Sequence, residues 1–490
     1  MSVFKNTIAK IFKRKKENAL LERSYEGATT SQSIRWVTNT SLANSANQAS
    51  LETLRNRARD MVRNNAFAES AVSKITSNII GSGVLHEFKG EFEDEIWKKW
   101  AESKECDAEG ILTYYGLQEL IIRELVESGE VFIRKMSFGF DPQKRNIPLK
   151  LRLYSSEYLD MSKNGMFHDD NYISQGVEID KLGRRVAYWM FPYHPENDLG
   201  WRQVSVRIPA DEIIHVFKPK RAGQVRGVTW FAPVLIDLKM SDNYQSAELK
   251  RKEQNSSISG FITNHDDNTV TRKRDNTFYT KIVPGSIMEL PSSTTLTLTN
   301  PQSDAHYDQY NVSVLRKIAV GLNMTYEALT GDLSRVNFSS GRMGLIEFNR
   351  QVESWRWNLT IPMFCEQVSK WFLESAELAG YDTSKITHVD YTAPHREMID
   401  PVKETAAIVS SIRSGLKTHK EALKELGYNP QKFYEEIAEV NAILDEHKII
   451  LDSDPRHTTQ QGLSQNCQNF AQNNTDSEKK TDKNAPQEDE

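Results

Sequence analysis

At residues 315–342 the chain has the sequence LRKIAVGLNMTYEALTGDLSRVNFSSGR. Within it, residues 331–340 are rich in Gly, Asp, Ser and Asn, which favour turns over helix interiors. Residues typical of helices stand on both sides of this polar segment. The order is therefore helix, polar loop, helix, and we expect the loop to project from the protein.

The helix after the loop has one apolar face. Its large apolar residues recur at spacings of three and four, at Leu345, Phe348, Val352, Trp355 and Leu359. This spacing places them on one side of an α-helix. We therefore expect the helix to pack against another element and to run until Pro362.

Several other segments accompany this loop in a fixed order. They are an N-terminal helix with a glycine-rich exit (54–65 and 71–83), a turn before a long helix (226–235), a short β segment (284–291) and a helical segment near the C-terminus (400–404 and 415–418). With the loop, they closely resemble segments of the portal proteins of lambda-type tailed bacteriophages. The resemblance spans roughly residues 50–430, a length that a coincidence of motifs rarely covers.

The resemblance implies an α+β portal fold assembled as a ring. Each subunit of such a ring has a helical and β-rich wing, a two-helix stem, a small β-rich clip and a helical crown. The expected divisions are an N-terminal arm (1–50), the wing (51–229), the first stem helix (230–257), the clip (258–302), the second stem helix (303–322), the tunnel loop with its long helix (323–380), the crown (381–450) and a polar tail (451–490).

Residue patterns agree with these divisions in the wing. Residues 51–80 repeat apolar side chains at spacings of four and three, which predicts one long amphipathic helix. Five short β-branched or aromatic runs follow within residues 131–217 and predict a sheet packed by helices. We interpret the arginines of the helix as a solvated face rather than a DNA-binding stripe: Arg55, Arg57, Arg59 and Arg63.

The polarity of the first stem helix changes along its length. Residues 230–257 are expected to be helical, with Pro233 in the first turn. The first half is apolar and the second half is polar, so the helix leaves the core, and in a ring its far end would pack on neighbouring copies. A basic run near that end is a candidate for the wet inner wall of the channel, with exposure on the outer wall as the alternative: Lys250, Arg251 and Lys252.

Two further sets of side chains are candidate sites. The resemblance implies that the tunnel loop lines the DNA channel with Asp332, Ser334, Arg335, Asn337, Ser339 and Ser340. Of these, Arg335 and Asn337 are best suited to meet phosphate. In the clip, with expected strands at 278–282, 286–290 and 294–299, a basic run is a candidate docking site or else an exposed turn: Arg272, Lys273 and Arg274.

Composition limits the function classes. The 490 residues carry a net charge of −5, which suits a conduit along which DNA slides better than a tight phosphate binder. No apolar run reaches the ~18 residues of a membrane span, and no secretory signal is evident. The three cysteines are far apart, which disfavours a disulfide framework and a zinc site. The tail is too polar to fold by itself and is expected to be disordered.

Catalytic signals are poor. The groups His168-Asp-Asp-Asn171 and His265-Asp-Asp-Asn268 could ligate a metal, but they lie in polar stretches where these residues usually form turns. Residues 395–400 hold another His/Asp group. No GxxxxGK[ST] phosphate loop and no HExxH motif is present. We therefore expect a structural protein with no cofactor, and keep a metal-dependent nuclease as the alternative.

The resemblance also implies the partners. The ring would be a homododecamer at the portal vertex of the virion capsid, assembled in the bacterial cytoplasm without a membrane. Double-stranded DNA would pass through it without sequence specificity. Its protein partners would be the terminase large subunit, the head-tail joining proteins, and the major capsid protein with its scaffold.

Reversing the charges of Arg272, Lys273 and Arg274 to glutamate is expected to weaken docking of the terminase large subunit, because a basic surface steers an acidic partner. The loss should be greatest at low salt. Binding of terminase to purified rings at two ionic strengths measures it, and ring formation in electron micrographs is the control. An unchanged affinity at low salt would assign the run to an exposed turn.

Overall fold

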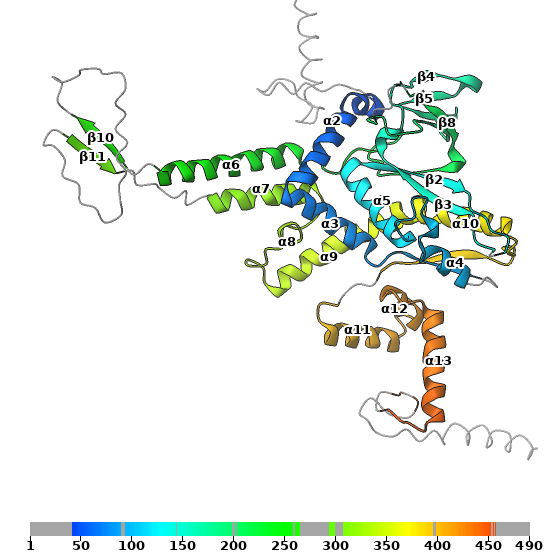
Figure 1. Cartoon of the computed structure of the whole chain (residues 1–490). Helices are drawn as coiled ribbons and strands as arrows, with labels where there is room; N and C mark the ends of the chain where they lie inside the picture. Colours follow the sequence, from blue (N-terminus) through cyan, green and yellow to red (C-terminus); the bar gives the residue numbers. More distant parts are fainter. Residues whose placement is uncertain are drawn as a thin grey trace, which may run out of the picture.

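Two long helices project from a mixed body of helices and sheets (Figure 1). The structure, a computed structural model, describes residues 42–89, 94–143, 145–197, 201, 203–257, 260–264, 294–298, 307–394, 398–451, 454 and 456. The body contains the larger apolar core, built mainly from helices and one face of a sheet. The expected α+β class is confirmed.

The N-terminal helix is divided in two, so the prediction of one continuous helix is wrong. The first part, α2 (Ala43–Asn64), begins inside the expected arm, and the second part is α3 (Ala66–Ile80). Between them Asn65 has an extended backbone, and its side-chain oxygen accepts hydrogen bonds from the amides of Phe67 and Ala68 at 3.0 and 3.1 Å. Asparagine in this position starts a helix more readily than it continues one.

Aromatic side chains fill the centre of the body. The helix α5 (Tyr114–Ser128) packs on α2 and α3, and α4 (Asp94–Ala101) adds two tryptophans. The rings of Trp97, Trp100, Tyr114 and Phe372 lie 4.8–5.7 Å apart around this centre. Two strands close the cluster by pairing antiparallel, β1 (Leu85–Lys89) and β12 (His388–Thr392).

The strands of the expected sheet domain form two sheets. The first is antiparallel with the order β3-β2-β9, formed by β3 (Leu149–Tyr154), β2 (Glu130–Ser137) and β9 (Ile213–Phe217). The second has the order β4-β5-β6-β7-β8, formed by β4 (Gly165–Met166), β5 (Tyr172–Ser174), β6 (Val177–Ile179), β7 (Arg185–Met190) and β8 (Val206–Pro209). The five predicted runs match β2, β3, β7, β8 and β9. The strands β4, β5 and β6 were not predicted, because a segment of two or three residues is too short to show an alternation of apolar and polar side chains.

The long helix after the tunnel loop continues past Pro362, where it was expected to end. It consists of α9 (Phe338–Trp355), a π-helix η6 (Arg356–Cys365) that contains Pro362, and α10 (Glu366–Leu378). Hydrogen bonds in a π-helix reach five residues back rather than four, which displaces the carbonyl that a proline ring would meet in an α-helix. The predicted apolar face is buried from Phe348 onward, whereas Leu345 is exposed.

The segment expected to form the crown has three helices with the starts that their capping residues predicted. Asp400 accepts a hydrogen bond from the Lys403 amide at α11 (Pro401–Arg413). Thr418 caps α12 (His419–Glu425), and Asn429 caps α13 (Pro430–Glu446). In Figure 1 these helices lie below the body.

A buried ionic cluster joins the first sheet to the start of the stem. The Arg226 guanidinium and the Glu130 carboxylate are fully buried and paired, with Arg226 Nε 2.9 Å from Glu130 Oε1. Glu130 also accepts hydrogen bonds from the Gly227 amide at 2.7 Å and from His215 Nε2 at 3.0 Å. Burial by itself would raise the pKa of Glu130, but the Arg226 charge and the His215 hydrogen bond lower it well below its usual range. Burial lowers the pKa of His215 to about 4.

The interpretation of the α2 arginines as a solvated face is wrong for two of the four. Arg55 is buried and lies 2.7 Å from Glu157, with its Nη1 donating to Ser156 Oγ at 2.6 Å. Arg59 also pairs with Glu157. Both arginines therefore extend the buried ionic cluster to α2, while Arg57 and Arg63 are exposed as expected.

Replacing Glu130 by glutamine is expected to lower the free energy of unfolding by about 3–5 kcal/mol, because the Arg226 charge would remain buried without its counter-charge. Chemical denaturation of the purified variant measures the change. Glu212→Gln, which breaks the partly exposed Arg134–Glu212 pair at 3.0 Å, is the matched control and should cost about 1 kcal/mol or less. Equal losses in the two variants would contradict this role for Glu130.

Candidate functional site

The segments expected to form the stem are a hairpin of two helices that leaves the body. It consists of α6 (Leu235–Ser257) and α7 (Tyr307–Gly321), which lie side by side in Figure 1. Beyond them, β10 (Gly260–Asn264) and β11 (Thr294–Leu298) pair antiparallel at the far end. The described part of the second helix begins at Tyr307, within the expected range of 303–322. The first begins at Leu235 rather than at residue 230, because turns occupy residues 230–234 and Pro233 precedes the helix.

The base of the stem requires a glycine. At the end of α7, a Cβ on Gly321 would lie 2.3 Å from Val234 Cγ1, so a larger residue would require either the Val234 side chain or the backbone of the two segments to shift. Near the same end Lys317 Nζ lies 2.7 Å from Asp237 Oδ1. The hairpin is therefore closed tightly where it meets the body.

The polar half of α6 packs on α7 of the same chain. The Tyr244 ring lies 5.9 Å from the Tyr307 ring and 4.9 Å from the Tyr310 ring, and Gln245 donates to Asn311 at 3.2 Å. This packing buries few side chains. Among residues 241–253 the structure buries only Ser241 and Glu248.

The three basic residues of the stem differ in their surroundings. Arg251 pairs with Glu248 at 2.8 Å, and Lys252 lies 3.9 Å from the same carboxylate and 5.1 Å from the centre of the Tyr307 ring. Lys250 is exposed and forms no ion pair with the described residues.

The tunnel loop is held to its surroundings at both ends. It follows α8 (Tyr326–Thr330), whose C-cap Gly331 has a φ of +75°, in the left-handed region that favours glycine. The Asp332 carboxylate accepts hydrogen bonds from the Tyr326 hydroxyl at 3.2 Å and from the Ser334 amide at 3.0 Å. Arg335 Nη2 lies 2.7 Å from Asp308 Oδ2 at the start of α7.

The loop is shorter than the sequence indicated. Asn337 and Ser340 form a capping box that starts α9, so Ser339 and Ser340 belong to the first helical turn. An asparagine three residues before a serine was a readable start signal, although serine is less usual at the second position than Glu or Gln. Asp332, Ser334 and Arg335 remain in the loop, and Asn337 serves as a cap.

The candidate docking site in the clip lies outside the described residues. This applies to Arg272, Lys273 and Arg274 and to the expected strands at 278–282 and 286–290. The strand expected at 294–299 is present as β11, and its partner β10 was not predicted.

The His/Asp groups do not form a metal site in the part of the chain that is described. His168 to Asp170 form a short helical turn, in which Asp170 pairs with Lys181 at 2.6 Å. Asp400 caps α11. The group at 265–268 and residues 395–397 lie outside the described residues. Among the described residues, no three His, Cys, Asp or Glu side chains converge as metal ligands.

Two further sequence expectations can be compared with the structure. Cys106 and Cys365 are free and buried, and burial raises the pKa of each thiol to about 12; Cys467 lies outside the described residues. No helix within the described ranges is both long and apolar enough to cross a bilayer.

Comparison with known families identifies the chain. The model of "Phage portal protein, lambda family" matches residues 29–356, which is more than half of the sequence. The chain belongs to the lambda family of phage portal proteins. Its function is that of a phage portal at the capsid vertex.

Curated relatives agree along most of their length. The probable portal protein of Halomonas phage phiHAP-1 is 27% identical over 421 residues, covering 79% of this chain and 80% of the relative. Portal protein B of Escherichia phage lambda is 24% identical over 449 residues, covering 77% and 81%. The portal protein of Escherichia phage N15 is 23% identical over 447 residues, covering 77% and 82%.

Solved structures with some likeness are particle necks. A chain in the neck of an empty gene transfer agent particle, computed with C6 symmetry, is 15% identical with a TM-score of 0.48, over 78% of this chain and 94% of that one. A chain in the neck of the native particle, computed with C12 symmetry, is 13% identical with a TM-score of 0.46, over 76% and 94%.

Hydrogen exchange should report on the stem. Amides of residues 241–257 are expected to exchange much more slowly in the assembled protein than in separated subunits, because a thinly packed helix is marginal alone. Mass spectrometry of both forms measures this, with α5 as a control that is protected in each. If residues 241–257 are equally protected in both forms, the helix is stabilised within its own subunit and the stem assignment fails.

Proposed function

We propose that twelve copies of this chain form the portal ring, with the α6–α7 hairpins side by side around a central channel for double-stranded DNA. The observation that carries the proposal is the stem itself. It extends away from the body (Figure 1), and its outer part packs mainly on itself, with the Asp308–Arg335 ion pair as a link to the tunnel loop. A helical hairpin standing free in water is poorly stabilised, whereas neighbouring copies can flank it on both sides.

Exposed apolar side chains on the stem support a ring. Ile236 and Met240 lie one turn apart on α6 and are 71% and 64% exposed, and Val320 near the end of α7 is 75% exposed. Isolated exposed apolar residues are ordinary, but these three gather near the base of one hairpin. A neighbouring subunit in a closed ring would cover them.

The tunnel loop is proposed to line the channel and to contact DNA weakly. Its one cation, Arg335, is already paired with Asp308, so its positive charge is partly compensated. Its other polar side chains are neutral or acidic: Asp332, Ser334 and Asn337. Such a loop contacts phosphates without binding them tightly, which allows the duplex to slide without sequence specificity.

The same proposal assigns the partners. The terminase large subunit docks on the clip during packaging and the head-tail joining proteins follow, while the major capsid protein and scaffold surround the wing. The chain supplies a passage and no catalysis, and the ring assembles in the host cytoplasm before it becomes part of the virion.

Replacing residues 333–336 by a Gly/Ser segment tests the proposal. This change keeps Asp332 and the Asn337 cap, so negatively stained rings should look like those of the natural protein, while the yield of DNA-filled heads should fall at least tenfold. Asp308→Asn is a milder companion that releases Arg335 and should slow packaging. Small oligomers instead of rings from the natural protein would overturn the ring, and normal DNA-filled heads from the loop variant would overturn the role of the loop.

A further inference from the structure

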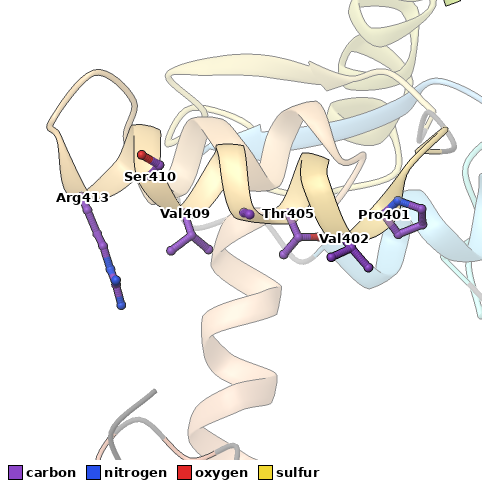
Figure 2. A pocket seen from close by; sticks show the side chains of 7 residues that line it. Pro401, Val402, Thr405, Val409, Ser410 and Arg413 are labelled. Atoms are coloured by element: carbon purple, nitrogen blue, oxygen red, sulfur yellow. The ribbon is translucent and has the colours of Figure 1, made fainter. Parts of the chain in front are cut away.

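The helix α11 has no buried residue. Its exposed face consists of side chains at helical spacing, Val402, Ala406, Val409 and Arg413, and Val402 is 80% exposed. Figure 2 shows Val402, Thr405 and Val409 on the same side of the helix, where they border a surface hollow of about 640 Å³. An apolar stripe in this position is a packing face without a partner in the described chain.

The helix α13 is also largely uncovered. Pro430 is its only buried residue, and its apolar side chains Tyr434, Ile437, Val440 and Ile443 are each 41–49% exposed. Ile437 and Val440 border a second hollow of about 490 Å³. Figure 1 shows α13 leading away from α11, so the two helices do not cover each other within one chain.

Helices of this length need a partner. Isolated helices shorter than about 12–15 residues are marginal in water, and most of the stability of a helix in a protein comes from packing of its apolar face. Here α11 has 13 residues, within that range, and its apolar face is exposed. The longer α13 has 17 residues, and its apolar face is about half exposed in a hollow that Leu451 of the same chain also lines. A covering element would stabilise both helices.

Charge indicates what covers them. The α11 segment carries Lys403 and Arg413 against Glu404, a net charge of +1. The α13 segment carries Lys432 against Glu435, Glu436, Glu439, Asp445 and Glu446, a net charge of −4. The two helices have apolar faces and opposite net charges, so each is suited to the other, and the charge of −4 disfavours pairing of α13 with a copy of itself.

We propose that α11 of one subunit packs on α13 of the next subunit, with the Val402 and Val409 face against the Ile437 and Val440 face. This contact rests on the proposed ring and deepens it. Because the two faces differ, the contact is head-to-tail, the type that closes a ring and not the type that makes a symmetric dimer. The crown is then a continuous belt of alternating α11 and α13 helices.

Site-directed labelling provides the first test. In a Cys467→Ser background, Val409→Cys and Ala407→Cys place thiols on opposite sides of α11, and both parent residues are exposed in the single subunit. Cys106 and Cys365 are buried and contribute little background. In purified rings, the thiol introduced by Val409→Cys should react with a maleimide at least tenfold more slowly than the thiol introduced by Ala407→Cys. Similar rates for the two variants would overturn the contact.

Cross-linking provides the second test and identifies the covering element. A chain with both Val409→Cys and Val440→Cys, treated as a ring with a short bis-maleimide, should give a ladder of covalent oligomers well beyond the dimer. The matched control, Ala407→Cys with Val440→Cys, should remain mainly monomeric.

The other outcomes each count against the proposal. A ladder that stops at the dimer would indicate a symmetric contact, and a monomer linked within itself would place α11 on its own α13. Protection of the thiol in the Val409→Cys variant without any ladder would indicate cover by another segment of the chain, such as residues 457–490. All three can occur in intact rings, so they overturn this contact alone, whereas absence of rings in micrographs would overturn the proposed function.

Discussion

The buried pair of Arg226 and Glu130 is the constraint on which the placement of the stem depends. Glu130 is the first residue of β2 and Arg226 stands shortly before α6, so the pair fixes where the stem leaves the body. Its position also explains why a paired charge is kept in the core. Removal of either partner would leave an unpaired charge with no access to water, which is far more costly than loss of a surface pair. The cluster extends through Ser156 to Arg55, and so the orientation of α2 is tied to the same point.

Local signals explain what could be predicted from the sequence. The crown helices begin at Asp400, Thr418 and Asn429 because a capping side chain acts within three residues of itself, which one sequence displays. The strands of the first sheet were likewise predicted from short β-branched or aromatic runs between turn residues, whereas the second stem helix was predicted from the family resemblance. Asn65 carried an equally local signal, but its place in an apolar repeat concealed it.

Contacts between distant residues explain what could not be predicted. Arg226 and Glu130 are 96 positions apart, so the sequence around Arg226 does not indicate that its side chain is buried. The same holds for Arg55. In the tunnel loop, Arg335 was chosen as a phosphate ligand because it is the only cation there. Its partner Asp308 is 27 positions away at the other end of α7, and that pair changes the chemistry of the loop. The family resemblance gave the function of the chain, and only the fold shows how the charges are used.

The π-helix between α9 and α10 changes the hydrogen-bond register of the long helix. Successive residues of an α-helix are rotated by about 100° around its axis, so a one-residue register change within residues 356–365 would turn α9 by about that angle while α10 stays in the core. Such a turn would carry Asn337 and the tunnel loop around the axis of α9 at the end far from the core. Phe348, Val352 and Trp355 of α9 are buried in the core, so such a turn would expose them to water. The register of η6 therefore fixes the direction in which α9 holds the loop.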